Sequence, residues 1–155
     1  MIVSFDLDDT LFVSPDYFKV EDELRFPWNK IYRERLRYGT ISLLKELQKQ
    51  GIQVWIYTTS FRSERYIFGL FHHYGIKLND VINGARHARE VQGSKTEPMP
   101  SKYPGKYRID LHIDDDVSVL HNSRIYGFNV HIIEAQDDKW DKKVLDKIEG
   151  MKKNL

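Results

Sequence analysis

The sequence predicts an α/β fold, a three-layer sandwich around a mainly parallel sheet of about five strands. Short apolar runs alternate with helical patterns along most of the chain, as βαβ crossovers require. Two of these runs end in clustered carboxylates, at residues 6–9 and 114–116. Open α/β sheets place their ligands at the carboxyl ends of parallel strands. The expected architecture is therefore Rossmann-like, with a polar site at one edge of the sheet.

Each element follows from its local pattern. We expect strands at 2–6, 54–58, 80–83, 109–113 and 130–133. A helix begins with Thr40 as its cap and ends at Gly51, where glycine suits the C-terminal turn. Further helices are expected over 63–74 and 117–126, and a last one starts near Asp137. The last helix has three apolar residues at helical spacing for its buried face, Trp140, Val144 and Ile148.

Two stretches do not fit the alternation. Residues 11–39 mix aromatic and charged residues and are interrupted by Pro15 and Pro27, whereas 84–108 are rich in glycine and proline and are expected to form a long loop. Long loops inside compact domains are often functional. Because no linker divides the chain, we expect a single domain over 1–155 with small inserts at 11–39 and 84–108.

Composition excludes several classes of function. The 24 Lys and Arg residues nearly balance the 23 Asp and Glu residues, so no global charge favours nucleic acid or a membrane surface. The absence of cysteine excludes thiol catalysis and Cys-ligated zinc. No run approaches the roughly 18 apolar residues of a membrane span, and the first residues lack the pattern of a signal peptide. We therefore expect a cytoplasmic protein without membrane association.

The carboxylates that follow two strands indicate a metal site. Carboxylates at such close spacing repel one another, so they usually share a bound cation or a proton. A divalent metal is the simplest choice. Another strand lies between these two strands in the sequence, and it ends in Thr58, Thr59 and Ser60. If the three strands are parallel neighbours, carboxylates, hydroxyls and metal meet at one edge of the sheet.

This ordered set of motifs resembles the haloacid dehalogenase-like phosphohydrolase superfamily. Residues 6–10 match its Asp-x-Asp-x-Thr motif, Thr58 follows the second strand, and Asp114 and Asp115 follow the third. In this superfamily, cap domains that enclose small substrates are inserted at the places of 11–39 and 84–108. Neither insert is large enough for a full cap domain, so we expect an uncapped or lightly covered site. Such sites accept large substrates or use a lid from an oligomeric partner.

The resemblance implies roles for the acids. Asp6 matches the nucleophile that forms an aspartyl-phosphate. Asp8 matches the general acid and base, and its backbone carbonyl matches a metal ligand. Asp114 and Asp115 match the paired acids that complete the Mg²⁺ site, whereas Asp116 is expected to cap the following helix.

The hydroxyl and the cations of the motif are less sharply defined. Thr58 matches the residue that hydrogen-bonds a phosphoryl oxygen, and Thr59 is its rival because the strand end can shift by one residue. Arg62, at a helix start just after this motif, is expected to contact substrate. The motif lysine usually lies a helix before the acid pair, and it has three candidates in the second insert, Lys95, Lys102 and Lys106. We prefer Lys102, because a spacing of this order occurs in deoxyribonucleotidase-like members and Lys106 is expected to lie too near the strand.

Other polar residues are expected to be structural. His112 should fill one face of the sheet rather than bind metal. Two basic clusters, one in each insert, are expected on the solvated surface rather than on a phosphate: Arg33, Arg35 and Arg37, and Arg86, His87 and Arg89.

The function implied is that of a Mg²⁺-dependent phosphatase acting on a phosphorylated substrate through Asp6. Nucleotides or polynucleotide ends form a narrower alternative, in which Trp28 or Tyr32 stacks on a base. A module that binds metal and phosphate without catalysis is the alternative from another class. The motifs do not separate hydrolysis from transfer to another acceptor. Dehalogenation is not expected, because that branch does not need the second acid, here Asp8.

Overall fold

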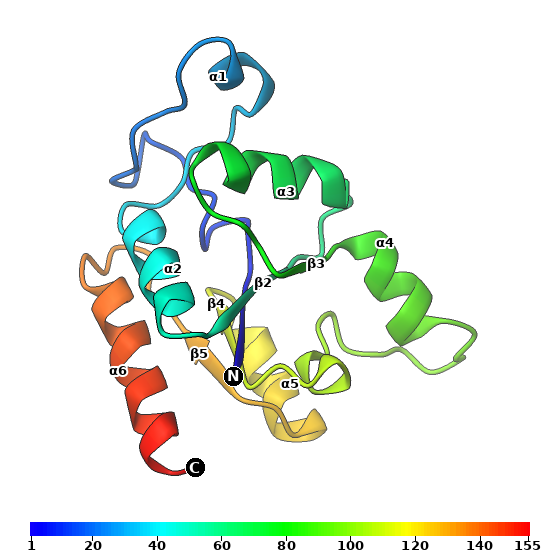
Figure 1. The fold of residues 1–155 in the computed structure, drawn as a ribbon. Coiled ribbons are helices and arrows are strands. Elements are labelled where there is room, and N and C mark those ends of the chain that lie inside the picture. The colour runs from blue at the N-terminus through cyan, green and yellow to red at the C-terminus, as the bar shows by residue number, and fades with distance from the viewer.

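A five-stranded parallel sheet forms the centre of the computed structural model, which describes residues 1–155 (Figure 1). Its strands are β1 (Ile2–Phe5), β2 (Gln53–Tyr57), β3 (Asp80–Ile82), β4 (Leu111–Asp114) and β5 (Val130–Ile132). Their order is β3-β2-β1-β4-β5, and every neighbouring pair is parallel. The predicted α/β class and parallel sheet are confirmed. The carboxyl ends of β1, β2 and β4 share one edge, as the site requires.

Three helices cover one face of the sheet and bury most of the apolar side chains. They are α2 (Thr40–Lys49), α3 (Glu64–His73) and α6 (Trp140–Lys153). Their apolar residues join the side chains at alternate positions of the strands, such as Val3 and Phe5, in one cluster of 25 buried residues. Helices α2 and α6 lie side by side (Figure 1). Right-handed crossovers place successive helices on one face while the strand order runs in one direction.

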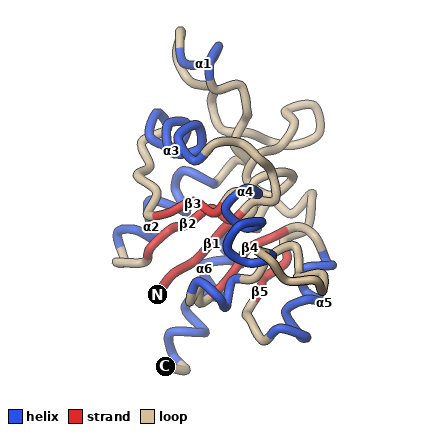
Figure 2. The backbone as a smooth tube through the Cα atoms, turned by 90° about the vertical axis from the view of Figure 1, so that its right-hand side faces the viewer, coloured by secondary structure: helices blue, strands red, loops and turns tan.

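The opposite face has a thinner and more polar cover. It involves α5 (Val117–Tyr126), α4 (Gly84–His87), the π-helix η1 (Ala88–Gln92) and the 3₁₀-helix η2 (Pro104–Tyr107). In Figure 2, which views the molecule from the α4 side, α4 lies in front of the strands. The apolar cluster that includes Tyr57, Ile82 and Ile109 is much smaller than the first. Polar strand residues can therefore lie on this face without disrupting the main core.

The two inserts and several boundaries differ from the sequence prediction. The first insert contains only one short helix, α1 (Trp28–Ile31), which projects at the end of the molecule (Figure 1). The loop expected over 84–108 is wrong in part, because α4, η1 and η2 lie within it. Strand β4 begins at Leu111 rather than 109, and α6 begins at Trp140 rather than near Asp137.

The start of α2 corrects another expectation. Thr40 is the first helical residue and makes no side-chain cap; the cap residue is Gly39, at a φ of 97°. The carboxylate of Glu21 accepts hydrogen bonds of 3.1 Å from the N–H groups of Gly39 and Ile41. A negative charge at a helix N-terminus is favourable, so the first insert supplies the cap that Thr40 does not.

The start of α5 and the ends of α2 and α5 agree with the residues found there. Asp116 caps α5 as predicted, because its side chain accepts a 2.8 Å hydrogen bond from the N–H of Ser118. Gly51 and Gly127 end their helices at φ values of 79° and 70°. None of the helices is long and apolar enough to cross a membrane.

Candidate active site

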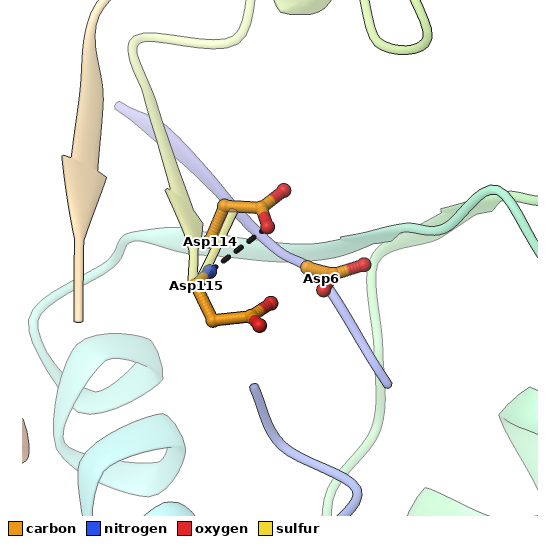
Figure 3. A group of neighbouring side chains, drawn as sticks. All are labelled: Asp6, Asp114 and Asp115. Carbon is orange, nitrogen blue, oxygen red and sulfur yellow. Dashed lines mark hydrogen bonds between the residues drawn. The ribbon is translucent and has the colours of Figure 1, made fainter. Parts of the chain in front are cut away.

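Three carboxylates meet at the carboxyl ends of β1 and β4 (Figure 3). Asp6 directly follows β1, Asp114 is the last residue of β4, and Asp115 is the next residue. One oxygen from each of the three lies within 4.8 Å of the others. Asp6 and Asp114 are buried and Asp115 is half-buried. This is the acidic cluster that the two strand ends predicted.

Thr10 joins two of these acids. Its Oγ1 lies 2.9 Å from Asp6 Oδ2 and 2.9 Å from Asp115 Oδ1. A hydroxyl has one proton, so it can donate to only one of the two carboxylates at a time. The other contact requires a protonated carboxyl group or a nearby cation. Thr10 belongs to the motif at 6–10, but no sequence pattern predicted its bridging position between two carboxylates.

A buried ammonium lies on the other side of the cluster. Lys102, only 3% exposed, has its Nζ 2.7 Å from Asp6 Oδ1 and 2.5 Å from Asp114 Oδ2. Burial opposes its charge, but the two carboxylates raise the pKa of Lys102 above its ordinary value. Lys95 and Lys106 are exposed and line a different hollow. Of the three candidate lysines, the structure brings Lys102 to the acids.

The two acids that share this lysine differ in protonation. Burial raises the pKa of Asp6 to about 6, although Lys102 acts in the opposite direction. Burial also opposes ionisation of Asp114, but the hydrogen bond from His112 and the charge of Lys102 hold the pKa of Asp114 well below its usual range. Burial, with the neighbouring Asp114, raises the pKa of Asp115 as well. Asp114 is the fixed anion, and Asp6 and Asp115 hold their charges less firmly.

His112 supports Asp114 from the sheet. It is fully buried on the predicted face, with Nε2 2.8 Å from Asp114 Oδ2 and Nδ1 2.7 Å from Ser4 Oγ. Burial lowers the pKa of His112, so the neutral ring donates from Nε2 to Asp114 and accepts from the Ser4 hydroxyl. The expectation that His112 only fills space was incomplete. Residues two apart in a strand share a face, and that spacing was the available signal for Ser4 with Asp6 and for His112 with Asp114.

The acids form one wall of an open pocket of about 660 Å³. Only two of its lining residues are hydrophobic, so the pocket suits an ionic ligand rather than an apolar one. It is lined by Asp6, Asp8, Asp9, Thr59, Ser101, Lys102, Asp114, Asp115, Asp116, Val117, Ser118 and Val119.

The donor set fits Mg²⁺. Asp6, Asp114 and Asp115 offer carboxylate oxygens only, which this hard cation prefers, and the open pocket leaves room for the waters that Mg²⁺ retains. The contacts of Thr10 with two carboxylates also favour a positive charge at this point.

Comparisons with known proteins agree with this architecture. No family model matches the chain, and no curated protein matches it. Among solved structures, the chain is similar to a HAD-superfamily hydrolase, subfamily IA, variant 1, from Geobacter sulfurreducens PCA, with a TM-score of 0.56 and 14% identity over 94% of this chain and 98% of that chain. The chain has the haloacid dehalogenase-like fold. A predicted HAD-like family hydrolase from Porphyromonas gingivalis is also similar, with a TM-score of 0.53 and 10% identity over 95% and 96% of the two chains.

Within this haloacid dehalogenase-like fold, Asp8 and Arg62 lie together. The chain leaves β1 and turns through Asp9, whose φ of 63° is left-handed, and Asp8 lines the pocket half-exposed. Arg62 binds both oxygens of Asp8, at 2.9 and 3.0 Å, and its Nε donates to Glu34 Oε1 at 3.0 Å. Arg62 was expected to contact substrate, and in the structure its guanidinium pairs with the carboxylates of Asp8 and Glu34.

The two threonines after β2 are placed differently. Thr58 is 1% exposed, and its Oγ1 accepts a 3.1 Å hydrogen bond from the N–H of Ser60. Thr59 is exposed and lines the pocket. Of the two, Thr59 therefore borders the pocket, whereas Thr58 is buried.

The two basic clusters were expected on the solvated surface, and this expectation is wrong for some of their residues. Arg37 is only 4% exposed and donates to three backbone carbonyls. Arg86 pairs with Asp80 and Glu90, and His87 binds Tyr57. Arg33 and Arg89 are exposed, as predicted.

The aromatic residues proposed for base stacking are packed against the protein. The Trp28 ring stacks on His73 at 4.1 Å between centroids, and Tyr32 contacts His73 and Tyr66. One face of Trp28 is thus already covered.

Proposed function

We propose that this protein is a Mg²⁺-dependent phosphatase that hydrolyses phosphomonoesters through an aspartyl-phosphate on Asp6. The observation that supports this most directly is the buried ammonium of Lys102 between Asp6 and Asp114, beside an open pocket lined by carboxylates. A cation so buried within reach of both acids can offset the charge of an incoming phosphoryl group. The fold alone does not separate hydrolases from other activities.

The residues divide the reaction into two displacements. In the first, an Asp6 oxygen attacks phosphorus while the bond to the leaving oxygen breaks, and Asp8 gives that oxygen a proton. In the second, Asp8 takes a proton from water, which attacks the same phosphorus and releases phosphate with Asp6 restored. Lys102 opposes the effect of burial on the pKa of Asp6 and so favours the anionic form that attacks. Thr59 borders the pocket, where its hydroxyl can donate to a phosphoryl oxygen.

The metal would be held by the carboxylates of Asp6, Asp114 and Asp115, with the backbone carbonyl of Asp8 as a further ligand. Bound there, Mg²⁺ supplies electrostatic stabilisation of the charge on the phosphoryl oxygens. His112 and Lys102 fix Asp114 as an anion, so this ligand is ionised before any cation arrives.

The test is phosphate release from a panel of sugar phosphates, nucleotides and phosphorylated oligonucleotides, with Mg²⁺ or with EDTA. Asp6→Asn keeps the size of the side chain and removes its nucleophilicity, so turnover should disappear while the fold is retained. Asp16→Asn, at an exposed position of the first insert, is the matched control and should keep wild-type activity. Full activity of Asp6→Asn would contradict the mechanism.

A module that binds metal and phosphate without catalysis is the second candidate. The bidentate pairing of Asp8 with Arg62 favours it, because that pairing occupies the group that must transfer the proton. Acid quenching of a reaction with a ³²P-labelled substrate distinguishes the two. An enzyme leaves label on Asp6 that hydroxylamine releases, whereas a binding module leaves none.

A further inference from the structure

The backbone that carries Lys102 has to be held in place by other parts of the protein. Lys102 lies between η1 and η2, in a segment without helix or strand. A lysine side chain has several rotatable bonds and loses about 2 kcal/mol of rotamer entropy when it is fixed. The site needs this ammonium at both Asp6 and Asp114, so something outside the segment must hold its backbone.

Tyr57 and His87 attach that segment to the sheet through one buried hydroxyl group. Tyr57, the last residue of β2, is fully buried, and its Oη accepts a 2.9 Å hydrogen bond from the N–H of Tyr103. The same Oη lies 2.6 Å from His87 Nδ1. The phenol and Nδ1 share one hydrogen bond, and the tautomer of His87 sets which of the two donates.

The hydrogen bond to Tyr103 holds the residue next to Lys102. His87 acts through Tyr57, because its ring bonds the same hydroxyl that accepts from the Tyr103 N–H. The backbone beside Lys102 is thus tied to β2 by one buried hydroxyl, and His87 orients that hydroxyl.

The environment keeps this pair in one protonation state. Burial raises the pKa of the Tyr57 phenol and lowers the pKa of His87, so both stay neutral. The Tyr57 ring also packs edge-on against His112 and Tyr107, with centroids 5.9 and 5.7 Å apart. Tyr57 therefore contacts both the support of Asp114 and the segment of Lys102.

We propose that Tyr57 and His87 are positioning residues that fix Lys102 between Asp6 and Asp114. They do for a lysine outside regular structure what a rigid helix would do for one within it. The consequence for turnover rests on the proposed phosphatase function, but the positioning itself does not.

The experiment measures the labelling rate of each lysine by an amine-reactive acetylating reagent under native conditions, with peptide mass spectrometry as the readout. Tyr57→Phe keeps the ring and removes the hydroxyl. Labelling of Lys102 should rise about tenfold or more, the effect of losing two ordinary hydrogen bonds, while Lys95 and Lys106 in the same molecule are unchanged. Tyr107→Phe is the matched control, since its hydroxyl bonds Glu90 instead, and it should leave Lys102 as in wild type. An unchanged Lys102 in Tyr57→Phe overturns the proposal.

Two variants of His87 test the same arrangement independently, in case Tyr57→Phe does not fold. His87→Ala should also raise Lys102 labelling, and His87→Gln, which keeps a donor and an acceptor, should restore part of the protection. The double variant Tyr57→Phe/His87→Ala should match the stronger single variant, because the two side chains act as one unit. Additive effects would overturn the coupled arrangement. If wild type hydrolyses no substrate, the phosphatase proposal fails while the labelling result still decides this one.

Discussion

The two inserts support the same site in different ways. The first insert acts from outside: Arg37 donates to the carbonyl oxygens of Asp9 and Thr10, at 2.9 and 2.7 Å. The second insert reaches the centre, because it delivers Lys102 to two buried acids. One insert fixes the backbone that carries the first motif, and the other supplies a charge that the motif needs.

The two inserts therefore differ in what they contribute: the first holds the backbone of the motif in shape, and the second supplies a charge. Arg37 binds neutral carbonyls, and its guanidinium lies over the rings of Phe18 and Trp140, 4.9 and 5.7 Å from their centroids. Its loss should mainly loosen the loop, because its hydrogen bonds go to carbonyls, and, of the three acids, should weaken only its charge interaction with Asp115, to which it is not hydrogen-bonded. Loss of Lys102 should leave the loop in place and leave two carboxylates unpaired. Substitutions in the two inserts can therefore test which contribution dominates.

The largest effect is expected for Lys102→Met, which has nearly the same shape but no charge. Phosphate release should fall by about 100-fold or more, as when one preorganised donor to developing charge is removed. The variant should also lose about 3–5 kcal/mol in urea unfolding, the cost of leaving a buried charge without its partner. Lys106→Met, at an exposed position of the same insert, is the control and should change neither quantity. Equal stability of the two variants would mean that the buried pair is dispensable.

A smaller effect is expected for Arg37→Met. Three backbone carbonyls, those of Asp9, Thr10 and Ala135, lose their donor, and each orphaned buried acceptor costs roughly 1 kcal/mol or more. Stability should fall by about 2–3 kcal/mol. Phosphate release should fall only about tenfold, through displacement of the loop. Arg33→Met removes an exposed arginine of the same cluster and serves as the control. If Arg37→Met loses as much activity as Lys102→Met, the separation of shape from charge is wrong.

The strands and main helices could be predicted because one local pattern decides each of them. The start of β4 could not, although 109, 111 and 113 are apolar at strand spacing. Arg108, directly before Ile109, has a left-handed φ of 58°. Ile109 packs with Tyr57 on the face of the sheet opposite to Leu111 and Ile113. A turn thus interrupts a pattern that looks continuous in sequence.

The second insert shows the same limit for helices. Asn83 and Gly84 suggest a turn, yet the Asn83 side chain accepts a 2.9 Å hydrogen bond from the N–H of Arg86 and begins α4. Glycine at the first helical position is unfavourable by propensity, so the sequence favoured a loop. A Cβ at Gly84 would lie 2.5 Å from the carbonyl oxygen of Thr59, which explains the glycine by packing rather than by flexibility.

The acids of the site were predictable, but their partners were not. Asp6, Asp114 and Asp115 follow strands, and parallel strands bring their carboxyl ends together whatever the loops do. The pairing of Arg62 with Asp8 and of Tyr57 with His87 depends on side-chain directions across segments 54 and 30 residues apart. No local pattern encodes such directions. The preference for Lys102 came from spacing in a family, and the structure supplies its physical reason.

The smallest effect is expected for Glu34→Gln, which sharpens the comparison within the first insert. Glu34 accepts from Arg62 at one oxygen and from the Tyr66 hydroxyl at the other, but these groups are partly exposed, so stability should fall by less than about 1 kcal/mol. Arg62 keeps its two bonds to Asp8, so phosphate release should change by no more than about threefold, the equivalent of a surface ion pair. Glu23→Gln, at an exposed position of the same insert, is the control. Should Glu34→Gln reduce turnover as strongly as Arg37→Met, the first insert would also act through charge, by way of Arg62 and Asp8, and its role could not be reduced to holding the backbone.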